Sequence, residues 1–234
     1  MDIKFASLIL GAYLLGSVPA AYLAAKWSRG IDIRHYGSGN VGFTNLFRFT
    51  SKRVAFSVLV FDLAKGISMV VASRLLGMNT TQQVTAGVAV VVGHSWPVFL
   101  RFNGGKGVLS TLGVALMLPS INSLVPWEII VFLAISAVCL FGFGSLPVGT
   151  GAGVATMPLV SWGFSRPLAL TLGFLVMFLL IVIRRLAAPR TSLTASVSRR
   201  QLIVNRLLFD RDIRDREAWV SRVPPRKRNG EHEE

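Results

Sequence analysis

Charged residues are scarce in this sequence. Asp, Glu, Lys and Arg make up only 15% of its 234 residues, whereas hydrophobic residues reach 52% and the mean hydropathy is +0.57. Soluble domains carry roughly a quarter charged residues. The composition therefore excludes an ordinary soluble domain. It predicts an integral membrane protein with several transmembrane helices, because each crossing needs roughly 17–25 mostly apolar residues.

Cysteine is nearly absent as well. The single Cys139 lies inside an apolar stretch, which excludes a disulfide framework, and it has no partners at metal-ligand spacing. The sequence also offers no Ser-His-Asp spacing and no paired carboxylates. We expect neither a metal nor a cofactor, and we expect few protein groups that act as nucleophile or base.

Basic residues are the abundant charge, and they are unevenly placed. The formal net charge is +14, and residues 184–234 hold 13 of the 25 Lys and Arg residues. Nucleic-acid binding is one reading of such a chain. The excess of Lys and Arg that membrane proteins keep on the cytoplasmic side explains it more simply. We therefore expect membrane lipids, and no nucleic acid, as partners.

The apolar residues fall into seven candidate spans and show no strand-like pattern, so the predicted fold is an all-α helical bundle. The spans are approximately 5–25, 54–76, 83–100, 107–119, 128–146, 152–164 and 168–186. The fourth and sixth are short, which indicates tilted or partly re-entrant segments.

The charges of the loops predict an orientation. Residues 26–53 between the first two spans hold six Lys and Arg residues, while only Asp2 and Lys4 precede the first span. The positive-inside rule then places the N-terminus outside and the C-terminus inside. A cleaved signal peptide over residues 1–25 is the alternative, but this leader lacks a net positive start.

We expect two parts along the chain: a transmembrane domain over residues 1–190 and a basic cytoplasmic tail over 191–234. Residues 198–221 mix apolar and charged side chains, which predicts an amphipathic helix on the inner membrane surface. A simple solvated tail is equally compatible with this pattern. Residues 224–234 are polar and rich in Pro and charge, which indicates disorder.

A first glycine motif, "GSGNVGFTNLFR" at residues 37–48, lies on the predicted inner side. Glycines let a backbone approach a ligand closely, and successive N–H groups can form an anion nest. Hydroxyl and amide groups add donors, and an Arg suits phosphate or carboxylate. The candidate residues are Gly37, Ser38, Gly39, Asn40, Gly42, Thr44, Asn45 and Arg48.

A second glycine motif, "GHSWPVFLRFNGGKGV" at residues 93–108, lies directly before the fourth span. A glycine-rich turn at a helix N-terminus favours an anion there. The candidate residues are His94, Gly104, Gly105, Lys106 and Gly107. The alternative for Lys106 is a positive charge that orients the chain in the membrane, and the alternative for His94 is a residue that ends a helix.

Asp62 and Lys65 share one helix face inside the second span, and we expect them to form a pair that braces the neighbouring loop.

Together the two glycine motifs and "DLAKG" at residues 62–66 resemble the integral membrane acyl-phosphate:glycerol-3-phosphate acyltransferases of bacteria. The match is nearly continuous over residues 8–115 and includes order, spacing and sidedness. The resemblance implies a seven-helix enzyme of phospholipid biosynthesis in the cell membrane, with its active site facing the cytoplasm. It would transfer an acyl group from acyl phosphate to the 1-hydroxyl of glycerol 3-phosphate.

The resemblance also implies roles for individual residues. Ser38, with Gly39 and Asn40, would help hold the donor phosphate near the reacting carbonyl, and Arg48 and Lys106 would hold phosphate. The remaining residues would bind substrate or shape the pocket: Gly37, Gly42, Thr44, Asn45, His94, Gly104, Gly105, Gly107 and Ser145. A substrate phosphate would then serve as the base.

The C-terminal half departs from the family pattern. Ser145 fills only the first position of an expected Ser-Leu-x-Ser element, and Phe43 replaces the usual Ala. After the seventh span the family has a His and an Asn, where this chain has Arg184 and Arg185. An altered donor or acceptor and an inactive scaffold with a lipid-binding tail are therefore alternatives. A transporter that binds a phosphorylated solute at half-helix N-termini is a third.

Overall fold

The computed structural model describes residues 3–188, 194 and 197–223, and these residues form helices joined by turns, with no strand among them. The all-α prediction is confirmed for this part of the chain. The helices are α1 Ile3–Ser17, α2 Ala20–Arg29, α3 Phe43–Phe49, α4 Lys52–Leu75, α5 Thr80–Ser95, α6 Val108–Ile121, α7 Trp127–Phe143, α8 Leu146–Gly163, α9 Leu168–Leu186, α10 Arg199–Phe209 and α11 Arg216–Val220, with the short 3₁₀ turns η1 Ile33–His35 and η2 Val98–Leu100.

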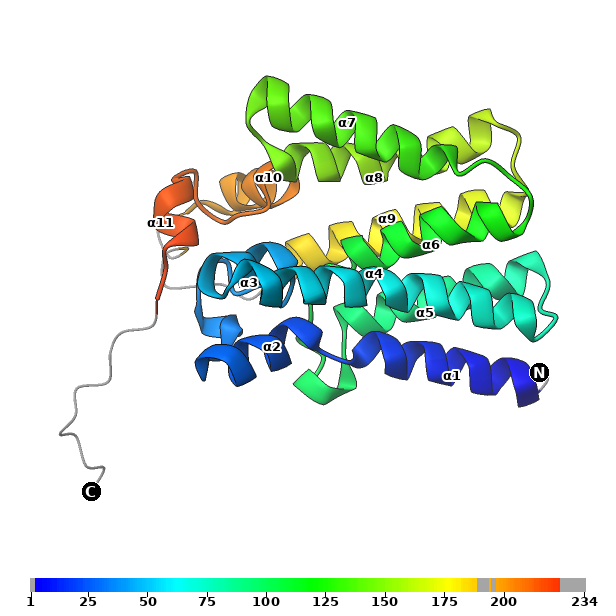
Figure 1. Cartoon of the computed structure of the whole chain (residues 1–234). Coiled ribbons are helices and arrows are strands. Elements are labelled where there is room, and N and C mark those ends of the chain that lie inside the picture. The colour runs from blue at the N-terminus through cyan, green and yellow to red at the C-terminus, as the bar shows by residue number, and fades with distance from the viewer. Residues whose placement is uncertain (1–2, 189–193, 195–196, 224–234) are drawn as a thin grey trace.

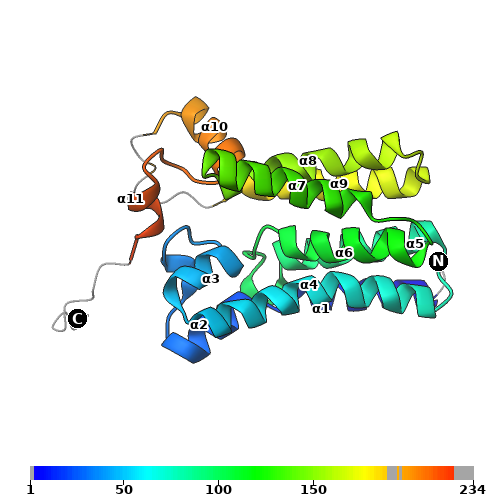
Figure 2. The same cartoon turned by 45° about the horizontal axis from the view of Figure 1, so that its top comes forward.

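The long helices lie side by side in a bundle whose two ends differ (Figure 1). α7 packs along α8, α4 along α6, and α1 along α5. Figures 1 and 2 both place α2, α3, α10 and α11 at one end of the bundle, and the N-terminus lies at the other end. The basic segments that the sequence assigns to one side of the membrane therefore share one end of the bundle.

Within the described residues, four helical stretches are long and apolar enough to cross a membrane: Ile3–Arg29, Lys52–Leu75, Thr80–Leu100 and Leu168–Leu186. α6 and α7 are shorter apolar helices. Large apolar side chains project outward from the bundle, among them Phe141 at 86% exposure and Leu159 at 69%. Such a surface suits lipid rather than water, and it agrees with an integral membrane protein.

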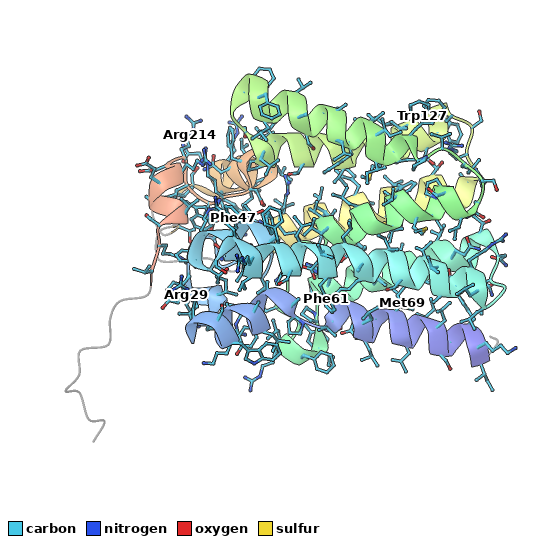
Figure 3. All side chains as sticks on the ribbon, in the orientation of Figure 1. Arg29, Phe47, Phe61, Met69, Trp127 and Arg214 are labelled. Atoms are coloured by element: carbon cyan, nitrogen blue, oxygen red, sulfur yellow. The ribbon has the colours of Figure 1, made fainter. Side chains whose placement is uncertain are left out.

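An aromatic pair lies at the end of the bundle that holds the N-terminus (Figure 3). Trp127 and Phe164 stack at 5.4 Å between ring centroids, at the end away from α2 and α11. Figure 3 shows Trp127 at this end and Arg29 and Arg214 at the other. Trp is enriched where a membrane meets water, so the position of Trp127 suits a membrane interface at this end of the bundle.

The first predicted span is divided in the structure. α1 ends at Ser17 and α2 begins at Ala20, with Pro19 between them, because proline has no N–H for a helical hydrogen bond. Lys65 of α4 satisfies carbonyls that this break releases, at 2.6 Å to Val18 O and 3.3 Å to Gly16 O. Its Nζ lies 2.9 Å from Asp62 Oδ1, so the predicted pair is confirmed and braces the break.

The predicted tail helix over residues 198–221 forms two helices, α10 and α11, with a turn between them. Asp210 at the end of α10 takes a left-handed φ of 57°, which breaks the helix. Arg206 of α10 pairs with Asp212 of the turn, with 2.7 Å between Nε and Oδ1, and both side chains are buried. α10 packs against α8 and α9. The predicted domain boundary at 190/191 and the predicted disordered residues 224–234 lie outside the described residues.

Candidate active site

The first glycine motif forms a tight loop that leads into α3. Gly37 and Gly39 take left-handed φ values of 52° and 71°, which favour glycine. Asn45 holds this loop from α3 and is 1% exposed. Its Nδ2 donates to Tyr36 O at 2.9 Å, and its Oδ1 accepts from the N–H of Ser38 at 3.2 Å. Asn45 therefore fixes the shape of this loop.

The remaining polar groups of the first motif are more accessible. Ser38 and Asn40 are half-buried, and the N–H of Asn40 donates to Ser38 Oγ at 3.4 Å. Thr44 and Arg48 are exposed on α3. Gly42 precedes α3 in extended conformation. Arg48 lies within electrostatic range of Asp210 and Arg216 in the tail, so its guanidinium faces the end of the bundle that the tail covers.

The second glycine motif folds against α5. The N–H groups of Gly104 and Gly105 donate to Ser95 O at 3.3 Å and His94 O at 3.1 Å. A Cβ on Gly104 would collide with His94 O, and one on Gly105 would collide with His94 Nε2 and lie 2.6 Å from Val41 O. Only glycine fits these two positions. Since Val41 belongs to the first motif, the two glycine motifs meet at Gly105.

Gly107 and Lys106 connect the second motif to α6. Gly107 takes a φ of 79° at the N-cap of α6. His94 lies between this motif and the buried pair, since its Nδ1 lies 3.5 Å from Asp62 Oδ1. A small pocket at this junction is lined by residues that include Val41, Asp62, His94, Gly104 and Gly105. Of the site residues predicted from the sequence, His94, Gly104 and Gly105 line this pocket, whereas Ser38, Arg48 and Lys106 do not.

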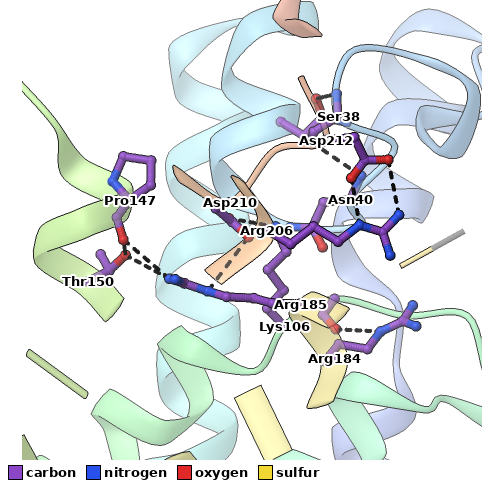
Figure 4. A network of polar contacts seen from close by, with 12 residues as sticks. Ser38, Asn40, Lys106, Pro147, Thr150, Arg184, Arg185, Arg206, Asp210 and Asp212 are labelled. Carbon is purple, nitrogen blue, oxygen red and sulfur yellow. Dashed lines mark hydrogen bonds and ion pairs between the residues drawn. The ribbon is translucent and has the colours of Figure 1, made fainter. Parts of the chain in front are cut away.

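The tail covers this end of the site. Lys106 Nζ lies 2.6 Å from Asp210 Oδ2, and Arg185 Nε lies 3.6 Å from Asp210 Oδ1 (Figure 4). The N–H of Gly37 donates to Arg222 O at 2.7 Å. Burial lowers the pKa of Lys106, while the neighbouring Asp210 carboxylate acts in the opposite direction. The predicted phosphate-binding lysine therefore already has an anionic partner in this chain.

Two arginines of α9 join the site, where the sequence shows a departure from the family pattern. Arg184 donates to Gly104 O at 2.8 Å, Gly105 O at 3.2 Å and Asn103 Oδ1 at 2.7 Å. Arg185 donates to Leu207 O at 2.8 Å. It also reaches Thr150 Oγ1 and Pro147 O of α8, both at 3.4 Å.

The contact of Asp210 with Lys106 was not predicted from the sequence. Arg184 and Arg185 stood out there only as the residues found where the family has a His and an Asn. An acidic residue just after an amphipathic helix in a strongly basic tail is the signal that was available. Ser145 lies at the N-cap of α8, near the contacts of Arg185 with Pro147 and Thr150, and in the described residues its side chain makes no hydrogen bond to either glycine motif. In the described residues, no group of three or more His, Cys, Asp or Glu side chains is placed to hold a metal ion.

Comparisons with known proteins agree with this geometry. A family model described as Glycerol-3-phosphate acyltransferase matches residues 6–193. Two curated proteins of Dehalococcoides mccartyi, Glycerol-3-phosphate acyltransferase 5 and Glycerol-3-phosphate acyltransferase 4, are 40% and 39% identical over 229 residues, which are 95% of this chain and 95% of each relative.

A solved structure has the same fold. The crystal structure of PlsY (YgiH), an integral membrane glycerol 3-phosphate acyltransferase, in its glycerol 3-phosphate form aligns with a TM-score of 0.70 and 29% identity. The alignment covers 92% of this chain and 97% of that chain. The lysophosphatidic acid form of the same enzyme aligns with a TM-score of 0.68 and 28% identity. The chain is a member of the glycerol-3-phosphate acyltransferase family.

Proposed function

We propose that the protein transfers an acyl group from acyl phosphate to the 1-hydroxyl of glycerol 3-phosphate, giving lysophosphatidic acid and inorganic phosphate. The observation that carries the proposal is the junction of the two glycine motifs at Gly105, with Lys106 beside it and Arg48 on the neighbouring helix. Both substrates carry a phosphate group, so two adjacent backbone cradles with two cations suit the pair. The family and its named relatives support the acceptor.

The proposed chemistry is a direct acyl transfer. The acceptor hydroxyl oxygen attacks the acyl carbonyl carbon, the bond from that carbon to the phosphate oxygen breaks, and phosphate leaves. The hydroxyl proton goes to a phosphate oxygen of a substrate. Because acyl phosphate is already activated, positioning and charge neutralisation supply most of the rate, which suits a site with few basic side chains.

Membership of the family supports individual roles for the predicted residues. Ser38, Gly39 and Asn40 hold the donor phosphate, and Arg48 and Lys106 neutralise phosphate charge. Gly37, Gly42, Asn45, Gly104, Gly105 and Gly107 fix the backbone of the two cradles, and Thr44, His94 and Ser145 contribute to substrate binding. The left-handed turns at Gly37, Gly39 and Gly107 support this division, because a side chain is strained there.

The proposed topology has seven membrane spans in the cytoplasmic membrane, with the N-terminus outside and the site facing the cytoplasm. The clustering of the basic loops at one end of the bundle supports it. Residues 1–190 form the transmembrane acyltransferase domain, and 191–234 form a basic cytoplasmic tail. α10 exposes Ile203, Val204, Leu207 and Leu208 beside the exposed Arg199 and Arg200, as expected for a helix on the membrane surface.

The decisive experiment offers the purified protein three donors: acyl phosphate, acyl-CoA and acyl-acyl carrier protein, each with glycerol 3-phosphate. We expect lysophosphatidic acid and free phosphate only with acyl phosphate. Ser38→Ala should lower kcat by about 100-fold or more, as loss of a group that stabilises transition-state charge does. Ser57→Ala is the matched control, since Ser57 is exposed and bonds only within its own helix, to Val54 O. Turnover with a thioester alone would overturn the proposal.

A further inference from the structure

The carboxylate of Asp210 occupies a position between two cations. Its Oδ2 lies 2.6 Å from Lys106 Nζ, and its Oδ1 lies 3.6 Å from Arg185 Nε. Each oxygen of one anion thus faces a cation from a different segment of the chain, as Figure 4 shows. A carboxylate and a phosphate present the same kind of oxygen edge to Lys and Arg. Asp210 therefore stands where an oxyanion ligand of Lys106 would stand.

Arg185 is buried but incompletely bonded. The residue is only 5% exposed, and within the described chain its Nε has no hydrogen-bond partner. The 3.6 Å to Asp210 is too long for a hydrogen bond. A buried charged N–H without an acceptor is costly, so this atom indicates a ligand that the carboxylate of Asp210 replaces imperfectly.

Arg184 and Arg206, the other two arginines buried in the described chain, do not share this property, whereas the Nε atoms of the less buried Arg211 and Arg222 do. The guanidinium of Arg184 is bonded to Gly104 O, Gly105 O and Asn103 Oδ1. That of Arg206 is bonded to both oxygens of Asp212 and to Leu186 O. Among the three arginines that are buried in the described chain, Arg185 is the one whose Nε lies near Asp210 without a hydrogen-bond acceptor.

The local charge favours a more highly charged anion than Asp210. Lys106 and Arg185 lie beside this one carboxylate, Arg48 lies within electrostatic range of it, and Arg184 lies within electrostatic range of Lys106. Asp212 is already engaged with Arg206. A phosphate monoester carries up to two negative charges and three acceptor oxygens. Such a group matches the surplus of cations better than one carboxylate does.

We propose that Arg185 is a phosphate-binding residue of the active site, and that Asp210 of the tail occupies this position until a substrate phosphate displaces it. The inference rests on the proposed function, because it assumes that Lys106 binds a substrate phosphate. The ligand is a phosphate monoester or acyl phosphate dianion. Asp210 then competes with substrate, and the tail must release Lys106 before the site is filled.

The first test is direct binding of inorganic phosphate, measured by calorimetry on the full-length protein in detergent. Asp210→Asn removes the internal competitor, so the Kd for phosphate should fall about five- to tenfold, in the usual range of coupling between two ligands. Asp215→Asn is the matched control, because Asp215 is an exposed N-cap of α11 in the same tail. An unchanged or higher Kd for Asp210→Asn would overturn the competition.

The second test separates the role of Arg185 from a structural one. Arg185→Ala and Arg185→Lys should both raise the Kd for phosphate, Arg185→Lys by less, since lysine keeps the charge but loses the fork. Arg214→Ala is the exposed control. If Arg185→Ala does not fold, the Kd of Arg185→Lys for phosphate still tests the assignment. A wild-type Kd in Arg185→Lys, with a wild-type Kd in any folded Arg185→Ala, would overturn the assignment.

Kinetics then identify which phosphate Arg185 binds. If KM rises for glycerol 3-phosphate with the donor saturating, Arg185 binds the acceptor; if KM rises for acyl phosphate, it binds the donor. Unchanged KM values for both substrates in Arg185→Lys would contradict the proposal. Failure of the proposed function has a different signature. The wild-type protein would then show no transfer from acyl phosphate, while the phosphate-binding measurements still decide the role of Arg185 and Asp210.

Discussion

The two sides of the site are held in place by different kinds of interaction. The glycine motifs at residues 37–48 and 93–108 depend on backbone fit, as at Gly105, where a Cβ would meet His94 and Val41. The opposite side, from α9 and the tail, depends on ion pairs between segments far apart in sequence, such as Lys106 with Asp210. A backbone cradle is formed before ligand arrives. Ion pairs can exchange partners, so adjustment to ligand belongs to the second side.

The largest effect is expected where backbone fit is tightest. Gly105→Ala places a Cβ against His94 Nε2 and Val41 O, so the two motifs must separate. Displacement of reacting groups by about 1 Å can cost about 100-fold in rate, and we expect kcat/KM to fall by at least that factor. Gly142→Ala is the control, since nothing lies within 4 Å of its Cβ. A loss below about fivefold, with wild-type melting temperature, would show that the junction is not rigid.

A smaller loss is expected when the two sides are disconnected. Arg184→Ala leaves the carbonyls of Gly104 and Gly105 and the Oδ1 of Asn103 without their donor. Unpaired buried groups cost about 1–3 kcal/mol each, part of which relaxes, so we expect kcat/KM to fall about 10- to 100-fold. Arg184→Lys should recover part of this, because it restores the charge but not the fork. Full activity of Arg184→Ala would mean that the second motif needs no support from α9.

The same contrast explains how much the sequence could predict. The glycine motifs are local, so their order and spacing identify the family and the positions of Ser38 and Lys106. The break at Pro19 was not predicted, although proline is visible in the sequence, because the apolar run continues through it. The role of Asp210 depends on a contact across 104 positions. Hydrophobic periodicity carries no information about such a pair, since either residue alone is an ordinary surface charge.

The pH dependence of catalysis tests the charge of Lys106. Burial lowers the pKa of Lys106, so its proton is lost at a lower pH than from an exposed lysine. Phosphate binding needs the charged form, and kcat/KM should therefore fall as pH rises through this lowered pKa, about tenfold per pH unit above it. Lys106→Arg should move the alkaline limb upward, because arginine stays charged.

The variant Asp210→Asn tests the direction in which this pH profile shifts. Its carboxylate raises the pKa of Lys106 against the effect of burial. Asp210→Asn should therefore move the alkaline limb of kcat/KM to lower pH, the opposite direction to Lys106→Arg. A limb that stays in place in both variants would assign the titration to another group, and the profile would then say nothing about the ion pair in Figure 4.

The smallest effect is expected at the outer face of α10, which touches neither glycine motif. Val204 and Leu208 are 42% and 50% exposed and lie one helical turn apart, beside the exposed Arg199 and Arg200. Serine at both positions weakens contact with lipid. We expect the activity ratio between anionic and zwitterionic nanodiscs to fall about two- to threefold, since surface helices respond to anionic lipid. Gln201→Ser on the same helix is the control. An activity ratio that stays at the wild-type value would show that α10 does not lie on the membrane surface. The tail would then act on the site through its direct contacts, such as Asp210 with Lys106 and Arg222 O with the N–H of Gly37.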